Sequence, residues 1–261
     1  MTEQDENTAA PAEEDLAEGT LISHLVELRN RLLKMFAATL AVFVVLLPWR
    51  GDIFTMVARP LMEVLPEGKM IATDVASTFL TPVKMAFFAA LFIAMPIVLY
   101  QIWAFVAPGL YRKEKRFAFP LLASSIALFY FGIAFAYYVV FPLIFKFFVG
   151  EAPELVEAQT DIAKFLDFII TIVFAFGLAF EVPIATVLVV WTGLTSPEKL
   201  SGARPYVFLG AFVIGMFLTP PDVISQTLLA VPIYILFELG IVMSKVFAIR
   251  KDEPEEEAVT D

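Results

Sequence analysis

Long apolar runs dominate this sequence, and they constrain its fold more than any other feature. A helix that crosses a hydrocarbon core about 30 Å thick needs about 20 consecutive apolar residues. Six stretches reach or approach that length: 32–49, 84–107, 117–145, 163–193, 205–220 and 223–244. We therefore predict an all-α polytopic membrane protein with six transmembrane helices.

The composition agrees with this class and excludes several others. Of the 261 residues, 59% are hydrophobic and 18% are charged, which is too little polar surface to cover a soluble globule of this size. The chain has no cysteine, and His24 is its only histidine, so disulfides and metal sites with several imidazoles are excluded. It contains no nucleotide-binding or hydrolase motif. We expect no enzyme activity, catalytic residue, metal or cofactor, and the membrane potential is the available energy source.

The last two apolar runs form an unusual hairpin. Only 14 residues lie between Pro205 and Pro220, which is about 21 Å of helix. The sequence TPPD at 219–222 then forces a reversal, because proline cannot continue a helix. We predict that the last two helices are short and that Asp222 is the N-cap of the sixth.

Charge placement predicts the orientation and the domain boundaries. Twelve of the 18 Lys and Arg residues lie on the side of the membrane that also holds both termini, so the termini are predicted to be cytoplasmic. Residues 1–20 hold seven acids and residues 252–261 hold six, without any Lys or Arg. We predict acidic disordered tails at 1–20 and 249–261 around a six-helix membrane domain at 21–248.

Polar side chains inside the apolar runs are the first candidate sites. Glu181 falls well inside the fourth run, where an ionisable group is costly and faces protein or a wet cavity. It is either a structural hydrogen-bond partner of a neighbouring helix or a polar contact site. The amides Gln101 and Gln226 lie in or beside apolar runs, where such groups usually bond between helices.

The stretch HLVELRNRLL at 24–33 places charges directly before the first run. Glu27 and Arg31 are i,i+4 neighbours on a helix, which is a modest stabilising pair. A second acid, Glu114, lies among four bases in YRKEKR on the same predicted face of the membrane. Two carboxylates on one cytoplasmic surface can accept hydrogen bonds from a pair of arginines, because guanidinium and carboxylate match as forks.

Five blocks of sequence carry a resemblance to a known family. They are HLVELRNRLL, IATDVASTFLTPVK, LYQIWAFVAPGLYRKEKR, FGLAFEVPIA and SPEKLSGARPYVFLGAFVIGMFLTPPDVISQTLLAVPIY. In this order they resemble the TatC family, the six-span receptor subunits of twin-arginine protein translocases, over about residues 20–248. The resemblance implies a concave arrangement of helices in the bacterial inner membrane and export of folded proteins driven by the proton-motive force.

The resemblance also implies partners and site residues. The expected partners are the single-span TatB and TatA subunits in a multimeric receptor complex, twin-arginine signal peptides and membrane lipid, and no nucleic acid. The signal-peptide-binding positions are Glu27, Arg29, Phe105, Pro108 and Glu114, and Glu181 is the intramembrane polar site. The partner-docking positions are Gln226, Thr219 and Gln101, and the structural or outer-loop positions are Pro60, Asp74 and Asp222.

Two other classes of function are compatible with the residues alone. A proton-coupled small-molecule carrier would use Glu181 as its protonation site and would work without partner proteins. A structural membrane anchor would tolerate replacement of both Glu27 and Glu181.

Overall fold

The computed structural model describes residues 10–63, 70–106, 115–150, 160–218 and 222–252. Within these ranges the regular elements are helices, and the only β pairing is a single bridge between Ile71 and Asp161. The helices of the first half are α1 (Ala10–Leu46), the 3-10 turn η1 (Leu47–Trp49), α2 (Arg50–Met62), α3 (Ser77–Val106), α4 (Lys115–Phe135), the π-helix η4 (Ala136–Val140) and α5 (Phe141–Gly150). Those of the second half are α6 (Ile162–Ala179), α7 (Val182–Trp191), α8 (Pro197–Gly202), α9 (Arg204–Leu218) and α10 (Val223–Asp252).

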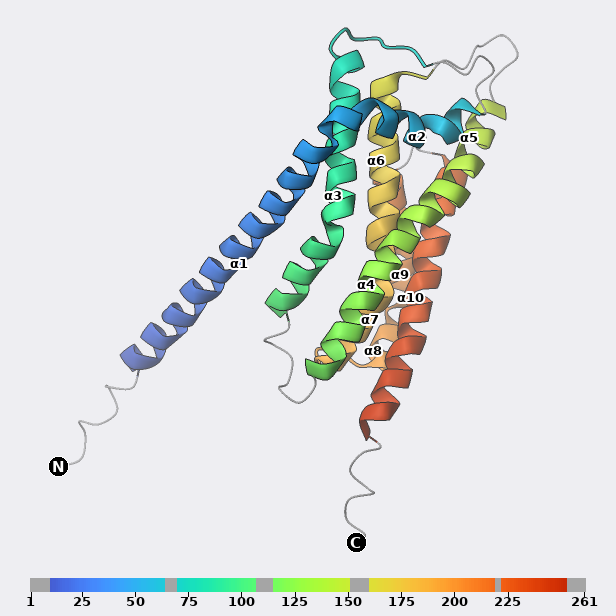
Figure 1. The fold of residues 1–261 in the computed structure, drawn as a ribbon. Helices are drawn as coiled ribbons and strands as arrows, with labels where there is room; N and C mark the ends of the chain where they lie inside the picture. Colours follow the sequence, from blue (N-terminus) through green and yellow to red (C-terminus); the bar gives the residue numbers. More distant parts are fainter. Residues whose placement is uncertain (1–9, 64–69, 107–114, 151–159, 219–221, 253–261) are drawn as a thin grey trace, which may run out of the picture.

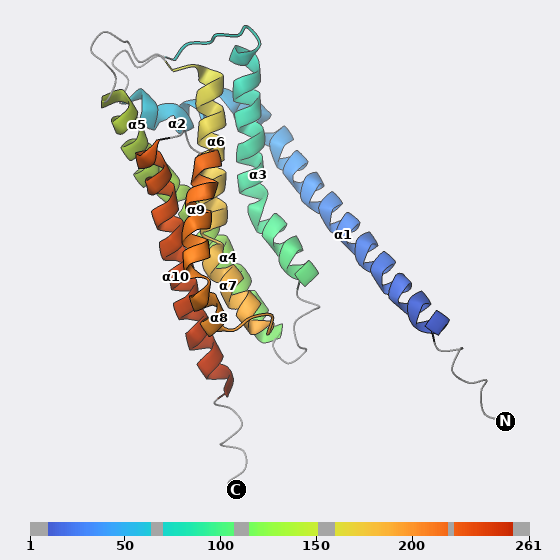
Figure 2. The same ribbon diagram turned by 180° about the vertical axis from the view of Figure 1, so that it is seen from behind.

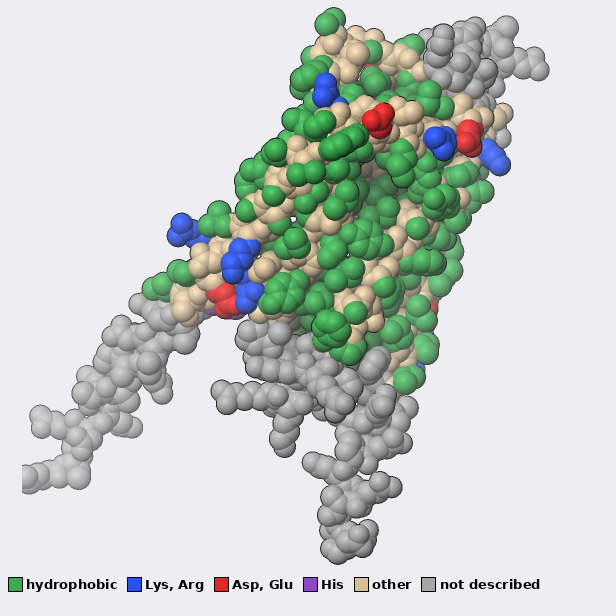
Figure 3. All heavy atoms as spheres, viewed as in Figure 1, with side chains coloured by type: hydrophobic (Ala, Val, Ile, Leu, Met, Phe, Trp, Pro, Cys, Tyr) green, Lys and Arg blue, Asp and Glu red, His purple; other side chains and the backbone are tan. Residues whose placement is uncertain are grey.

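Five stretches in the described residues are long and apolar enough to cross a membrane: Ile22–Met62, Ser77–Phe105, Phe119–Phe148, Ile162–Trp191 and Val223–Val246. The multi-pass membrane class is therefore confirmed. The fifth predicted span is α9, which is apolar but only 15 residues long, so its crossing of the membrane stays a prediction. Figure 3 shows hydrophobic side chains covering the middle of one face, with Lys, Arg, Asp and Glu gathered toward its two ends.

The prediction that both of the last two helices are short is wrong for the second. The helix α10 has 30 residues, because it tolerates Pro232 inside an apolar run and continues beyond that run through Lys245. Long aliphatic and basic side chains favour helix, and a proline in a membrane helix is tolerated where neighbouring helices support the backbone.

The helix ends also differ from the predicted domain boundaries. The helix α1 begins at Ala10, inside the tail predicted at 1–20, and α10 ends at Asp252, inside the tail predicted at 249–261. Ala, Leu and Glu are strong helix formers, so these acidic segments extend the neighbouring helices instead of leaving them at the last apolar residue. Residues 1–9 and 253–261 lie outside the described residues.

Prolines set the breaks within the long helical stretches. Pro142 follows the π-helix η4, whose wider turn accommodates a ring that would clash with the carbonyl four residues earlier. Pro183 stands at the start of α7 and separates it from α6, with Glu181 in the break as the N-cap residue. Pro96 lies in the C-terminal half of α3, the half that bends toward α1 in Figure 1.

The core lies between α4, α5 and α6. Phe129, Phe141 and Phe176 are fully buried there. The helices α4 and α6 come close enough that a Cβ on Gly132 would lie 2.6 Å from the carbonyl oxygen of Phe176, and one on Gly177 would lie 2.7 Å from the ring of Phe129. Small residues allow such close backbone approach between membrane helices.

The helix α1 is the least enclosed of the long helices. In the apolar stretch Ile22–Met62, which contains most of α1, only 6% of the most apolar part is buried, compared with 56% in the stretch Ile162–Trp191. In Figure 1 it slants away from the other helices toward its N-terminus, with α3 as its neighbour, and Figure 2 shows α9 and α10 side by side on the opposite face. The start of α1 and the end of α10 lie at the same end of the molecule, which we call the lower end after Figure 1.

Candidate functional site

A guanidinium joins α1 to α3 near the lower end. Arg31 donates from Nε (2.9 Å) and from Nη2 (2.5 Å) to Oε1 of Glu27. The same guanidinium donates to Oε1 of Gln101 at 3.2 Å and to the carbonyl oxygen of Ala104 at 3.0 Å. The Arg31 side chain is 19% exposed and that of Glu27 is 38% exposed. The predicted i,i+4 pair is therefore present, and it is part of a contact between two helices.

Helical spacing explains why these groups meet. Glu27 and Arg31 lie one turn apart on α1, and Gln101 and Ala104 lie one turn apart on α3, so each pair shares a face of its helix. One turn before Glu27 on the same face, His24 stacks on Phe105, with the ring centroids 4.3 Å apart and the planes at 23°. We call the group of His24, Glu27, Arg31, Gln101 and Phe105 the α1–α3 site.

The structure brings together part of the predicted signal-peptide surface. Glu27 and Phe105 belong to the α1–α3 site, and Arg29 is exposed two residues from Glu27, a spacing that turns it to another side of α1. Pro108 and Glu114 lie outside the described residues, so the prediction that Glu114 and Glu27 share one surface is not tested. The link from Arg31 to Gln101 joins residues 70 positions apart, and sequence reasoning missed it.

Glu181 is hydrogen-bonded within the helix bundle. Ser125 of α4, which is fully buried, donates from Oγ to Oε2 of Glu181 at 2.5 Å. The other oxygen, Oε1, is buried and has no hydrogen-bond partner among the described residues. Ser125 is thus the hydrogen-bond partner on a neighbouring helix that the structural interpretation of Glu181 requires. Its role as a polar contact site stays a prediction. The pair Ser124 and Ser125 in an otherwise apolar run was the available sequence signal.

At the upper end, the Asp161 carboxylate has a structural role that the sequence did not reveal. Asp161 is the N-cap of α6, and its Oδ1 accepts from the backbone N–H groups of Ala163 (2.9 Å) and Lys164 (3.0 Å). Its Oδ2 accepts from the backbone N–H (3.0 Å) and the hydroxyl (2.6 Å) of Thr73. We call this arrangement, with the paired backbones of Ile71 and Ile162, the Asp161 clamp.

Hydrogen bonding sets the charge state of the Asp161 clamp. The hydroxyl of Thr73 and the three backbone N–H groups favour the ionised carboxylate, and they lower the pKa of Asp161 from 3.8 to about 2. The predicted outer-loop residues lie nearby in sequence or at the same end. Asp74 is exposed and its carbonyl accepts from the Ser77 hydroxyl, whereas Pro60 is half-buried within α2.

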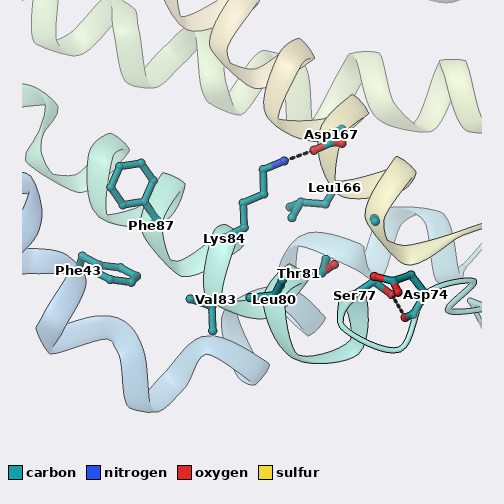
Figure 4. A pocket seen from close by; sticks show the side chains of 11 residues that line it. Phe43, Asp74, Ser77, Leu80, Thr81, Val83, Lys84, Phe87, Leu166 and Asp167 are labelled. Atoms are coloured by element: carbon teal, nitrogen blue, oxygen red, sulfur yellow. Dashed lines mark hydrogen bonds and ion pairs between the residues drawn. The ribbon is translucent and has the colours of Figure 1, made fainter.

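A pocket of about 510 Å³ opens beside the Asp161 clamp. Figure 4 shows Lys84 of α3 reaching Asp167 of α6 across it, with Phe43 and Phe87 on the opposite side. Apart from this ion pair and Asp74, its lining is mostly apolar.

The predicted partner-docking residues separate into two places. Gln226 donates from Nε2 to the carbonyl oxygen of Phe212 at 2.7 Å and so links α10 to α9. Gln101 instead contacts Arg31 in the α1–α3 site, and Thr219 lies outside the described residues. Asp222 caps α10 as predicted, because its Oδ1 accepts from the N–H of Ser225 at 2.7 Å.

Three kinds of comparison relate the chain to known proteins. The family model described as "Sec-independent protein translocase protein (TatC)" matches residues 23–232. A protein of that name from Azotobacter chroococcum mcd 1 is 54% identical over 242 residues, covering 92% of this chain and 93% of the relative. Its namesake from Escherichia coli K12 is 54% identical over 228 residues, covering 87% and 88%. A crystal structure described as "Twin Arginine Translocase Receptor- TatC" superposes with a TM-score of 0.78 at 35% identity, covering 86% of this chain and 99% of that one.

Proposed function

This chain belongs to the TatC family of Sec-independent protein translocase proteins, and from that premise we propose that it is the receptor for twin-arginine signal peptides. The peptide binds at the lower end of the molecule, which faces the cytoplasm, and the Glu27 carboxylate accepts a hydrogen bond from one of its two arginines. The protein resides in the bacterial inner membrane and works with TatB and TatA in export driven by the proton-motive force.

The observation that carries this proposal is the state of Glu27. Its side chain is 38% exposed, is held in place by Arg31, and uses only Oε1 in that contact. A carboxylate that is oriented and still accessible is suited to accept a hydrogen bond from an incoming guanidinium.

An ion pair alone cannot hold a signal peptide. An exposed pair contributes about 0 to 1 kcal/mol, so the apolar part of the peptide has to bury against protein or lipid as well. The helix α1 offers apolar surface directly beside Glu27, because Leu25, Leu32 and Phe36 are all more than half exposed.

The partner helices are proposed to dock on α9 and α10. The helix α9 is apolar and short, and the bilayer beside a short helix is filled by partners or by thinning. Several large apolar side chains of α9 are exposed: Phe208, Leu209, Val213, Ile214, Met216 and Phe217. The test is co-purification of the single-span subunits with the wild type and with a variant that has polar residues in place of Leu209 and Phe217. If both proteins retain the subunits equally well, this placement is wrong.

Binding of a labelled twin-arginine peptide to the full chain in lipid nanodiscs tests the proposal. We expect Glu27→Gln and Glu114→Ala each to weaken binding by about two- to fivefold, which is the size of one exposed ion pair. Glu63→Gln is the matched control, because Glu63 is an exposed acid at the opposite end of the molecule. The proposal fails if the wild type binds twin-arginine and twin-lysine peptides equally well.

A further inference from the structure

We propose that Arg31 is a positioning residue that makes the α1–α3 site select arginine over lysine. It does so by holding the Glu27 carboxylate through Oε1, while Oε2 has no hydrogen-bond partner among the described residues. This inference rests on the proposed signal-peptide function and names the residue that sets its specificity.

Arg31 is anchored independently of Glu27. Nη1 donates a hydrogen bond to the side-chain oxygen of Gln101, and Nη2 donates one to the backbone carbonyl of Ala104, both on α3. Because the guanidinium is planar, these two contacts fix the direction of the edge that faces Glu27. Arg31 therefore stays in place when the environment of Glu27 changes, as a positioning residue must.

The contact with Glu27 is one-sided. Both Nε and Nη2 of Arg31 donate to Oε1, and neither contacts Oε2. A carboxylate has two acceptor oxygens, so a second guanidinium can bond to Oε2 without displacing Arg31. With Oε1 held by two donors, the position of that oxygen is fixed and the carboxylate has fewer orientations open to it than a free one.

The charge balance of the pair explains the selectivity. Glu27 and Arg31 together carry no net charge, so a cation approaching them gains little from Coulomb attraction alone. Its binding then depends on a directional hydrogen bond to Oε2. Lysine presents a compact and strongly hydrated point charge, whereas arginine presents a planar set of donors, so arginine gains more from a fixed acceptor.

Loss of Arg31 should change this balance in a defined way. A Glu27 without Arg31 is a free carboxylate with full negative charge and mobile rotamers, and it attracts arginine and lysine to similar degrees. A purely structural tie between α1 and α3 makes a different prediction, since loosening the tie would weaken binding of both peptides by the same factor.

The experiment measures Kd for a twin-arginine peptide and its twin-lysine counterpart on the full chain in nanodiscs. The variants are Arg31→Gln and Arg31→Lys, with Arg59→Gln as control because Arg59 is an exposed base on α2 at the opposite end. We expect the ratio of the twin-lysine Kd to the twin-arginine Kd to fall by about two- to fivefold in Arg31→Gln, to fall by less in Arg31→Lys because the charge balance is kept, and to stay at the wild-type value in the control.

Each outcome has one meaning. An unchanged ratio in both variants, with or without equal weakening of the two peptides, overturns the inference and leaves the receptor function standing. A wild-type ratio of one defeats the receptor proposal itself. If Arg31→Gln does not give a monodisperse protein, Arg31→Lys decides alone, since it keeps the charge and lacks the guanidinium fork.

Discussion

Asp161 at the upper end and Glu27 at the lower end both belong to contacts between distant segments, Asp161 directly and Glu27 through Arg31, and they use their oxygens differently. Asp161 accepts four hydrogen bonds, two on each oxygen. Glu27 accepts from Arg31 on Oε1, and its Oε2 has no hydrogen-bond partner in the part of the chain that the structure describes. A carboxylate with both oxygens committed fixes structure, whereas one with a single committed oxygen can take a further partner. Mutation of the carboxylate is therefore expected to reduce stability at the upper end and to reduce binding at the lower end.

The largest expected effect is on stability at the upper end. Asp161→Ala removes the N-cap of α6 and leaves the N–H groups of Ala163, Lys164 and Thr73 without their acceptor. We expect Asp161→Ala to lower Tm, measured by thermal unfolding in detergent, more than any other substitution considered for the two ends. Asp161→Asn keeps one capping oxygen and should lose less. Equal Tm values for wild type and Asp161→Ala would remove the contrast between the two ends.

The second effect is a pH dependence of stability that comes from the Asp161 clamp. The folded-state pKa of Asp161 is lowered from 3.8 to about 2, so its contribution to stability is fully present above the unfolded value and is lost as pH falls from about 4 to about 2. The difference in Tm between wild type and Asp161→Asn should therefore shrink across that interval. A constant difference between pH 5 and pH 2 would show that hydrogen bonds to the ionised carboxylate are not its cause.

A smaller effect is expected from the aromatic contact at the lower end. Phe105→Ala removes the stacking with His24, and an aromatic pair contributes about 0.5 to 1.5 kcal/mol when it is enclosed, less when one ring is exposed as here. We expect faster amide hydrogen exchange in residues 22–34 and little change in Tm. Phe79→Ala, which removes an exposed ring at the upper end, is the control and should leave exchange in that segment unchanged.

The smallest effect is expected for the ion pair in the pocket at the upper end. Lys84 and Asp167 are each about half exposed or more, so the pair should contribute about 0 to 1 kcal/mol. Lys84→Met should shift Tm slightly, and added salt should reduce the difference from wild type. A shift as large as that of Asp161→Ala would mean that the upper end depends on charge and not on capping.

Local patterns in the sequence predicted much of the architecture. The length of the apolar runs indicated the spans, the spacing of Pro205 and Pro220 predicted the short α9, and the position of Asp222 after two prolines predicted its cap. The Glu27 and Arg31 pair followed from a spacing of four residues. Each of these inferences needs only geometry within one helix or one turn.

The contacts that the sequence did not predict join distant residues. Arg31 and Gln101 are 70 positions apart, and Thr73 and Asp161 are 88 positions apart, so the contacts depend on how whole helices pack. Ser125 could be read as a polar residue in a greasy helix but not as the donor to Glu181. The sequence did not predict the length of α10, because its apolar run ends at about residue 244 while the following residues still favour helix.

The close approach of α4 and α6 has a mechanical consequence. Gly132 on α4 faces the ring of Phe180 and the backbone of Phe176, and Gly177 on α6 faces the ring of Phe129. Each helix therefore keys an aromatic ring into a notch on the other, and neither can slide or turn without forcing a ring against backbone. Sliding of α4 along α6 is therefore opposed by the packing between the Asp161 clamp and the break at Glu181, so we expect the two helices to shift together.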